Sequence, residues 1–124
     1  MPDLAVAPTD HAFEQPARAA DAYQALIEEI GEDGASEVRS VFWNDTEMRL
    51  DLFGTLDLAE HRVRIAREAH SLKSAAGTFG YIRLAALAGQ LERTAETLNQ
   101  AGFRDLRDAM QSAYRAARAL EPQD

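Results

Sequence analysis

The chain has 124 residues, of which 46% are hydrophobic and 27% charged, the proportions of an ordinary globular domain with a core of its own. It contains no cysteine, which excludes disulfide bonds, thiolate zinc sites and cysteine nucleophiles. Its net charge of −8 argues against general binding to DNA or RNA, whose phosphates it would repel. Since no apolar run approaches the roughly 18 residues of a membrane span and no secretory leader is visible, we expect a cytoplasmic protein.

Residues 1–20 are predicted to form a flexible tail, because three prolines are spread there among small and polar side chains. The folded domain is expected over residues 21–124. Its first element is a short helix over residues 22–30, which Asp21 is suited to cap and which must dock on another element to be stable. The glycines that would end this helix are Gly31 and Gly34.

A longer helix is predicted over residues 35–55, with Ser36 as its cap and Gly54 in its last turn. Apolar residues form a stripe along it that we expect to face the core, although Asp45 interrupts this stripe. The stripe consists of Val38, Val41, Phe42, Met48, Leu52, Phe53 and Leu56.

The next helix is expected to begin at Asp57-Leu58-Ala59-Glu60, which has the spacing of a capping box, and to run to about Phe79. Gly80 would end it. Its apolar positions recur at steps of four and three residues, the spacing of helices that pack nearly parallel or antiparallel. These positions are Ile65, Ala69, Leu72, Ala76 and Phe79.

Two further helices are predicted, over residues 82–99 and 103–120, with Gly102 suited to a left-handed turn between them. Short turns favour antiparallel neighbours, and no alternating strand pattern occurs in the sequence. The predicted fold class is therefore all-α: an antiparallel four-helix bundle with an additional short N-terminal helix. The apolar positions are Leu84, Leu87, Leu91, Ala95 and Leu98 in the first of these helices, and Phe103, Leu106, Met110, Ala113, Ala117 and Leu120 in the second.

His70 lies in the one cationic segment of this acidic chain. Between His61 and Arg83, five arginine and lysine side chains accompany a single acidic residue, Glu68. No other histidine stands at helical spacing from His70, so no metal site is expected. The sequence also lacks a phosphate-binding glycine loop and a strand–turn–helix nucleophile elbow, which leaves it without a nucleotide site or a hydrolase triad of its own.

The helix surface beside His70 carries unusually small side chains, Ser74 and Gly77. A glycine inside a helix costs about 1 kcal/mol relative to alanine, so its presence suggests a use. One use is access, because another protein can approach the imidazole closely where no Cβ intervenes. Lys73, one turn on, can place an ammonium near a phosphoryl group on His70. Spacing alone leaves open a plain surface histidine with a glycine at a helix–helix contact.

The segment from His70 to Gly80 resembles the signature of histidine-containing phosphotransfer (HPt) domains of bacterial two-component phosphorelays. That signature reads His-x-Leu-Lys-Gly-x-Ala, followed by a further glycine and a leucine, and the leucine is Leu84 here. Leu91-Glu92 matches the family's Leu-Glu on the next helix. Ser74 departs from the pattern, since many members have glycine there, and this could alter the fit to partners.

The resemblance implies that Nε2 of His70 accepts a phosphoryl group, that Glu92 hydrogen-bonds the other ring nitrogen, and that Lys73 balances the phosphoryl charge. It implies a phosphocarrier that has no cofactor and is not itself an enzyme, with Mg²⁺ only in the partner receiver domain. The residues expected to give access to His70 or to form the docking surface are Val63, Arg67, Ser74, Gly77 and Gly80, with Tyr23, Leu26, Ile27 and Ile30 from the short first helix.

The partners implied are a sensor or hybrid histidine kinase and the receiver domain of a response regulator. Neither nucleic acid nor a membrane is expected as a partner, and the protein is expected to be a monomer. Three other interpretations remain open: a binding-only adaptor or inhibitor of a kinase with the same fold, the phosphotransfer module of a chemotaxis-type kinase, and a plain helical scaffold.

Overall fold

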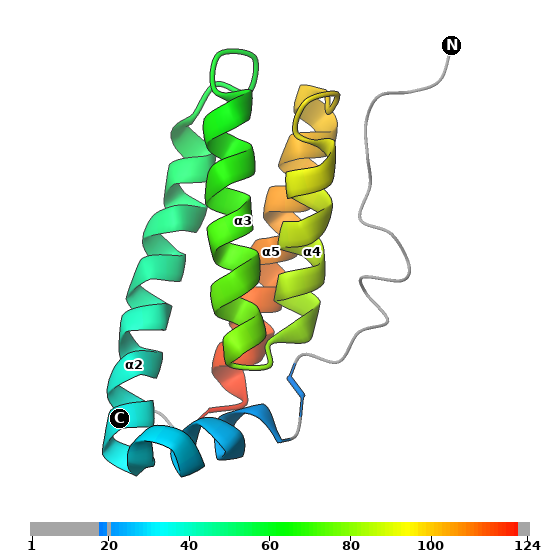
Figure 1. The fold of residues 1–124 in the computed structure, drawn as a ribbon. Helices are drawn as coiled ribbons and strands as arrows, with labels where there is room; N and C mark the ends of the chain where they lie inside the picture. Colours follow the sequence, from blue (N-terminus) through cyan, green and yellow to red (C-terminus); the bar gives the residue numbers. More distant parts are fainter. Residues whose placement is uncertain (1–17, 20, 122–124) are drawn as a thin grey trace.

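Four helices make up the part of the chain that this computed structural model describes, residues 18–19 and 21–121. No strand occurs within these residues, and none of their helices is long and apolar enough to cross a bilayer. The all-α prediction is therefore confirmed (Figure 1). The helices are α2 (Ala22–Thr55), α3 (Arg62–Thr78), α4 (Ile82–Thr94) and α5 (Gln100–Ala119).

Gly31 breaks α2 into two parts. Its backbone angles of φ 85° and ψ 165° lie outside the helical region, in a conformation that glycine adopts at little cost. The part before Gly31 runs across one end of the bundle, while the longer part after it runs along the bundle (Figure 1). The short N-terminal helix predicted over residues 22–30 is thus present, although no side-chain bond from Asp21 caps it.

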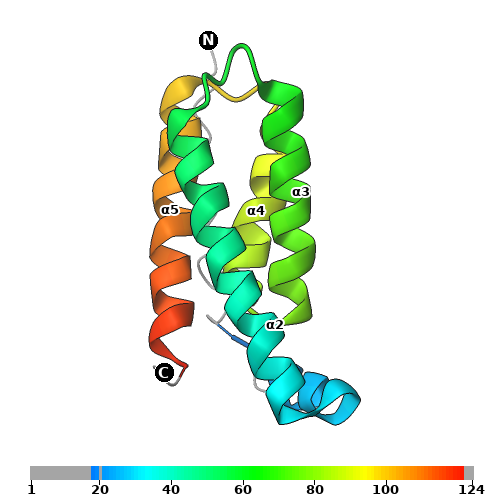
Figure 2. The same cartoon turned by 90° about the vertical axis from the view of Figure 1, so that its left-hand side faces the viewer.

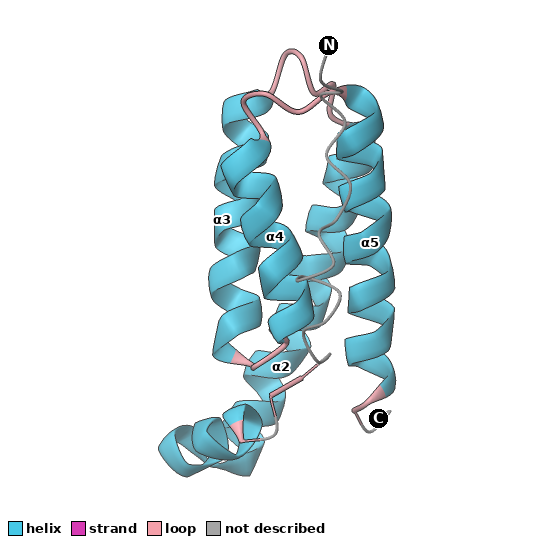
Figure 3. Cartoon of the chain, turned by 90° about the vertical axis from the view of Figure 1, so that its right-hand side faces the viewer, coloured by secondary structure: helices cyan, strands magenta, loops and turns pink. Residues whose placement is uncertain are grey.

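The long part of α2 and the helices α3, α4 and α5 form an antiparallel four-helix bundle (Figure 2). Helix α2 packs against α3 and α5, and α4 packs against the same two helices from the opposite corner. The loop between α3 and α4 lies at one end of the bundle, and the loops between α2 and α3 and between α4 and α5 lie at the other (Figure 3). Successive helices are therefore antiparallel neighbours, as short connections favour.

The predicted apolar positions of α3, α4 and α5 are buried, with one exception. Leu120 is 53% exposed because α5 ends at Ala119, before this residue could face the core. Around the α3–α4 turn the core is aromatic: the ring centroid of Phe42 lies 5.0 Å from that of Phe79 and 5.4 Å from that of Tyr81. Offset aromatic contacts of this kind add to the stability that burial alone provides.

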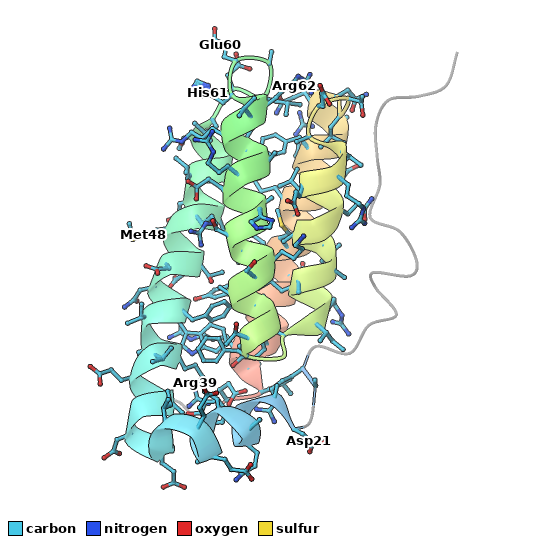
Figure 4. All side chains as sticks on the ribbon, viewed as in Figure 1. Asp21, Arg39, Met48, Glu60, His61 and Arg62 are labelled. Carbon is cyan, nitrogen blue, oxygen red and sulfur yellow. The ribbon has the colours of Figure 1, made fainter. Side chains whose placement is uncertain are left out.

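The stripe predicted for the long part of α2 is wrong at three positions. Val38, Val41 and Met48 are 43%, 54% and 70% exposed, and Met48 points away from the bundle (Figure 4). The face that packs on the core includes two polar residues, which an apolar pattern cannot identify, and Asp45 lies exposed outside it. The buried residues of α2 are Ala35, Arg39, Phe42, Trp43, Thr46, Leu50 and Phe53.

The predicted capping box is not one. Helix α3 begins at Arg62, with His61 at its N-cap position and no side-chain cap. Asp57 instead stabilises a separate turn, in which its carboxylate accepts a hydrogen bond from the amide of Ala59 at 3.3 Å. Leu58, buried inside this turn, is held in the core without being helical.

The boundary between α4 and α5 also differs from the prediction. Helix α4 ends at Thr94, and α5 begins at Gln100 with Asn99 as its N-cap. The side chain of Asn99 accepts a hydrogen bond from the amide of Gly102 at 2.8 Å, the standard N-cap geometry. Gly102 therefore lies in the first turn of α5 and not in a left-handed turn before it.

Gly80 is buried at the α3–α4 turn with φ of 76°, a conformation that favours glycine. A Cβ at this position would collide with Cβ of Ala22, so the glycine lets the short part of α2 pack directly on the turn. The carbonyl of Gly80 also accepts a hydrogen bond from the amide of Ala19 at 2.6 Å. Gly80 is therefore not exposed for docking, contrary to the expectation from the sequence, because Ala19 and Ala22 cover its backbone.

A buried carboxylate, that of Glu121, joins both ends of the described chain to the bundle. Its side chain is 4% exposed and pairs with Arg18 and with Arg39, the latter at 2.8 Å. The hydroxyl of Tyr81 donates to it at 3.2 Å, and burial together with the Glu121 charge raises the pKa of Tyr81. Arg18 and Ala19 thus contact the bundle, whereas residues 1–17 and 20 of the predicted tail lie outside the described residues.

We predict that Glu121→Gln lowers the free energy of unfolding by about 3 kcal/mol, because a neutral amide cannot balance two guanidinium groups at a buried site. Urea denaturation measures this change. Glu60→Gln, at an exposed position near the opposite end of the bundle, is the matched control and should leave the midpoint unchanged. Equal midpoints for the two variants would contradict the assigned role of Glu121.

Candidate functional site

His70, Lys73 and Glu92 meet on the outer surface where α3 packs against α4. Nδ1 of His70 lies 2.7 Å from Oε2 of Glu92. Nζ of Lys73 donates to the other oxygen, Oε1, at 2.6 Å. One carboxylate therefore binds a nitrogen of each of the two residues from α3, using a separate oxygen for each.

The fold brings these residues together through the symmetry of the α3–α4 hairpin. In an antiparallel pair of helices, positions equally distant from the turn lie opposite each other. His70 and Glu92 are each eleven residues from Tyr81 at the turn. Ala69 and Leu91, directly before them in the chain, are fully buried, which leaves the His70 and Glu92 side chains at the edge of the interface.

The imidazole of His70 is accessible, while its carboxylate partner is partly covered. The His70 side chain is 58% exposed and that of Glu92 is 27% exposed. The hydrogen bond from Lys73 lowers the pKa of Glu92, and the hydrogen bond to His70 lowers it further, against the opposing effect of desolvation. Glu92 is thus ionised at neutral pH and can only accept hydrogen bonds.

The ionised carboxylate fixes the tautomer of a neutral His70. Because Glu92 accepts, Nδ1 must carry the hydrogen atom that lies between the two side chains. A neutral imidazole has one N–H, so Nε2 then has an unshared electron pair. Because the two ring nitrogens lie on different sides of the imidazole, a contact of Nδ1 with Glu92 leaves Nε2 free of that carboxylate, on a side chain that is 58% exposed. The arrangement is suited to nucleophilic chemistry at Nε2.

The surface around His70 forms one exposed row along α3. Its members are spaced by four and three residues, so they share one exposed side of the helix. At one end Val63 is 72% exposed, and at the other end Gly77 has no atom within 4 Å of the position that a Cβ would occupy. We call this set the α3 face: Val63, Arg67, His70, Ser74 and Gly77.

Gly77 has neither a conformational nor a packing reason to be glycine within the described structure. Its φ is not positive, and a side chain there would extend into open space. Gly77 therefore does not lie at a helix–helix contact, which was the alternative explanation for a glycine at this position. The absence of a side chain leaves open helix surface at Gly77, two helical turns from His70.

The remaining expected docking residues come from the part of α2 before Gly31. Tyr23 and Leu26 pack against the core, and Tyr23 also lies under the guanidinium of Arg39, 4.2 Å from the ring centroid. Ile27 is half-buried, and Ile30 is 43% exposed. Of these four side chains, Ile30 offers the most apolar surface for contact with another molecule.

Among the residues that the structure describes, no group of three or more His, Asp or Glu side chains is placed to hold a metal ion. One residue that sequence reasoning overlooked does belong to the site. Gly89 on α4 lies beneath the side chain of Lys73, and the distance from its ideal Cβ position to Cδ of Lys73 is 3.3 Å. The hairpin symmetry could have identified it, since Lys73 and Gly89 are each eight residues from Tyr81.

Comparison with known proteins gives one result. The family model described as the Hpt domain matches residues 37–120, which is well over half of the chain and includes every residue of the α3 face, Lys73 and Glu92. Neither the curated proteins nor the solved structures yield a match.

We predict that Lys73→Met raises the pKa of Glu92, because the hydrogen bond from Lys73 is the largest influence holding it down. As pH falls, Glu92 would then be protonated, and its contact with His70 weakened, at a higher pH than in the native protein. An NMR titration of the Glu92 side-chain carbon measures this shift. Arg67→Met removes an exposed cation from the α3 face and should leave the titration nearly unchanged; equal effects of both substitutions would show a general charge effect instead.

Proposed function

The chain belongs to the Hpt domain family, and we propose that it relays a phosphoryl group on Nε2 of His70. The donor is a sensor or hybrid histidine kinase, or the receiver domain of that kinase, and the acceptor is the receiver domain of a response regulator. The observation that carries this proposal is the 2.7 Å contact between Nδ1 of His70 and the carboxylate of Glu92. It orients an exposed histidine and leaves Nε2 able to attack.

The chemical step is a displacement at phosphorus. The electron pair on Nε2 forms an N–P bond, the bond from phosphorus to the aspartate oxygen of the receiver breaks, and the aspartate leaves as a carboxylate. The imidazole gains positive character during the attack, since Nδ1 keeps its hydrogen atom. Glu92 stabilises that charge through the same hydrogen bond, as a carboxylate does for an imidazole that acts as a base or metal ligand.

Lys73 supplies a cation for the phosphorylated state. In the structure its ammonium lies on Glu92, on the Nδ1 side of the imidazole. Its side chain is 41% exposed, and a flexible lysine stem can bring the ammonium toward a phosphoryl group on Nε2. Two ionic partners would then share one ammonium, which balances the added negative charge.

The α3 face is the proposed docking surface for the partners. Val63 supplies exposed apolar area, Arg67 supplies a cation, and the small residues Ser74 and Gly77 leave open surface along the helix one and two turns beyond His70. The magnesium ion needed for phosphoryl transfer would belong to the receiver domain, so this chain serves as a substrate of its partners and needs no cofactor. We further propose that it acts as a monomer in the cytoplasm, with no nucleic acid or membrane as partner.

The alternative of a binding-only adaptor receives less support from the site. Binding alone needs neither a histidine oriented by a carboxylate nor a lysine on the second oxygen of that carboxylate. The same site is compatible with a phosphotransfer module of a chemotaxis-type kinase, in which His70 would have the same role.

We predict that the protein takes up one phosphoryl group from a phosphorylated receiver domain and that His70→Gln abolishes this uptake. The assay incubates the chain with a panel of receivers carrying labelled phosphate and follows the label. His61→Gln, at the N-cap position of α3 and nine residues before His70, is the control and should keep full uptake. If the His70→Gln variant takes up label to the native level, the proposal is contradicted.

We also predict that Gly77→Gln slows transfer from a receiver by at least about tenfold, which corresponds to roughly 1.4 kcal/mol in the activation free energy. The new side chain would extend into the open space that the partner needs, and it should hardly affect folding. Gly54→Gln, an exposed helical glycine on α2, is the matched control. If both variants transfer at the same rate, the access role of Gly77 is wrong.

A further inference from the structure

Gly89 on α4 is covered, although it has no side chain with which to pack. It is a buried residue whose ideal Cβ position lies 3.3 Å from Cδ of Lys73 and 3.2 Å from Nη1 of Arg93. Its φ is not positive, so its conformation does not require glycine. A glycine inside a helix is less favourable than alanine, and the space directly above it is the remaining reason for its presence.

The two side chains above Gly89 differ in how easily they could make room for a Cβ. Nη1 is the far end of the exposed Arg93 side chain and can move into solvent. Cδ of Lys73 is in the middle of a stem that is held at both ends, by the backbone of α3 and by the 2.6 Å contact between Nζ and Oε1 of Glu92. Moving that stem away from α4 therefore loosens the contact with Glu92.

We propose that Gly89 is a positioning residue of the phosphotransfer site: its missing side chain provides the space across which Lys73 reaches Glu92. This inference rests on the proposed function for its purpose and on the packing of α3 against α4 for its geometry. With Lys73 on Oε1, the carboxylate presents Oε2 to His70. Gly89 thus determines the orientation of the carboxylate at the imidazole through Lys73.

The test compares Gly89→Leu with Lys73→Met in the full chain. NMR titration of the Glu92 side-chain carbon is the first measurement, because the Lys73 hydrogen bond is the largest influence lowering the pKa of Glu92. We expect Gly89→Leu to raise that pKa, although by less than Lys73→Met does, because the leucine variant keeps the lysine charge. The double variant should show no further rise, since both changes remove one contact. Gly54→Leu serves as the control, because Gly54 is an exposed helical glycine on α2 whose ideal Cβ position lies 3.6 Å from Nη1 of Arg107, at an ordinary contact distance.

The proposal is overturned if Gly89→Leu leaves the pKa of Glu92 at its native value. It is also overturned if Gly89→Leu raises that pKa by the same amount in the Lys73→Met background as in the native protein. If the leucine variant does not fold, Gly89→Ala decides the question. Its Cβ is closer to the lysine stem than ordinary contact allows, so the pKa of Glu92 should still rise, by a smaller amount. An unchanged titration in folded Gly89→Ala overturns the proposal in that case.

A second measurement separates this inference from the proposed function. Phosphoramidate, a small phosphoryl donor, can phosphorylate an imidazole: the N–P bond to Nε2 forms, the P–N bond of the donor breaks, and ammonia leaves. We expect Gly89→Leu and Lys73→Met both to slow phosphorylation of His70, with the larger effect in Lys73→Met because that variant also loses the ammonium. A native rate in Gly89→Leu would count against the proposal. If His70 takes no phosphate but the titrations behave as expected, the proposed function fails while the positioning role of Gly89 stands.

Discussion

The carboxylate of Glu92 is the interaction on which the site depends. It accepts from Lys73 with one oxygen and contacts His70 with the other, so both functional side chains of α3 are oriented by one group on α4. An exposed histidine without such a partner rotates about its side-chain bonds and exchanges between tautomers. The contact with Glu92 removes both freedoms and directs Nε2 outward, which is what a phosphoryl carrier requires.

That contact in turn depends on the turn between α3 and α4. Gly80, in its left-handed conformation, starts α4 at the register that sets His70 opposite Glu92 and Lys73 opposite Gly89. The aromatic rings of Phe42, Phe79 and Tyr81 fill the core at this end of the bundle. The short part of α2 covers the turn from outside. A shift of one residue in the turn would rotate Glu92 away from the imidazole, so the packing of this end supports the chemistry at the middle of the hairpin.

The sequence was sufficient to predict the helices whose apolar residues repeat regularly, and it failed where polar residues take core positions. Arg39 and Thr46 are buried on α2, while Val38, Val41 and Met48 are exposed. Arg39 can be buried because Glu121 pairs with it across the fold, and no local pattern contains that partner.

The pairing of His70 with Glu92 was expected only from the family resemblance, since spacing alone does not identify a contact between two helices. The hairpin symmetry about Tyr81 supplies the physical reason for it. The same symmetry identifies Gly89 as the residue opposite Lys73, although neither the composition nor the family motif indicates a role for it.

Helix ends were predicted less well. The turn after Thr94 is stabilised by hydrogen bonds from Arg62 of α3 to the carbonyls of Ala95 and Leu98, and no local pattern contains that partner. At Asp57 the carboxylate accepts from the amide of Ala59 in a separate turn, although the same residues have the spacing of a helix cap.

The most direct test of the central claim is the tautomer of His70 in the unphosphorylated protein. Long-range ¹H–¹⁵N NMR spectra distinguish the two ring nitrogens of each histidine by their chemical shifts. For neutral His70 the structure predicts a protonated Nδ1 and an unprotonated Nε2, and it predicts that Glu92→Ala makes the two tautomers exchange. A protonated Nε2 in the native protein would contradict the account, because the nitrogen assigned to attack phosphorus would then have no electron pair to offer.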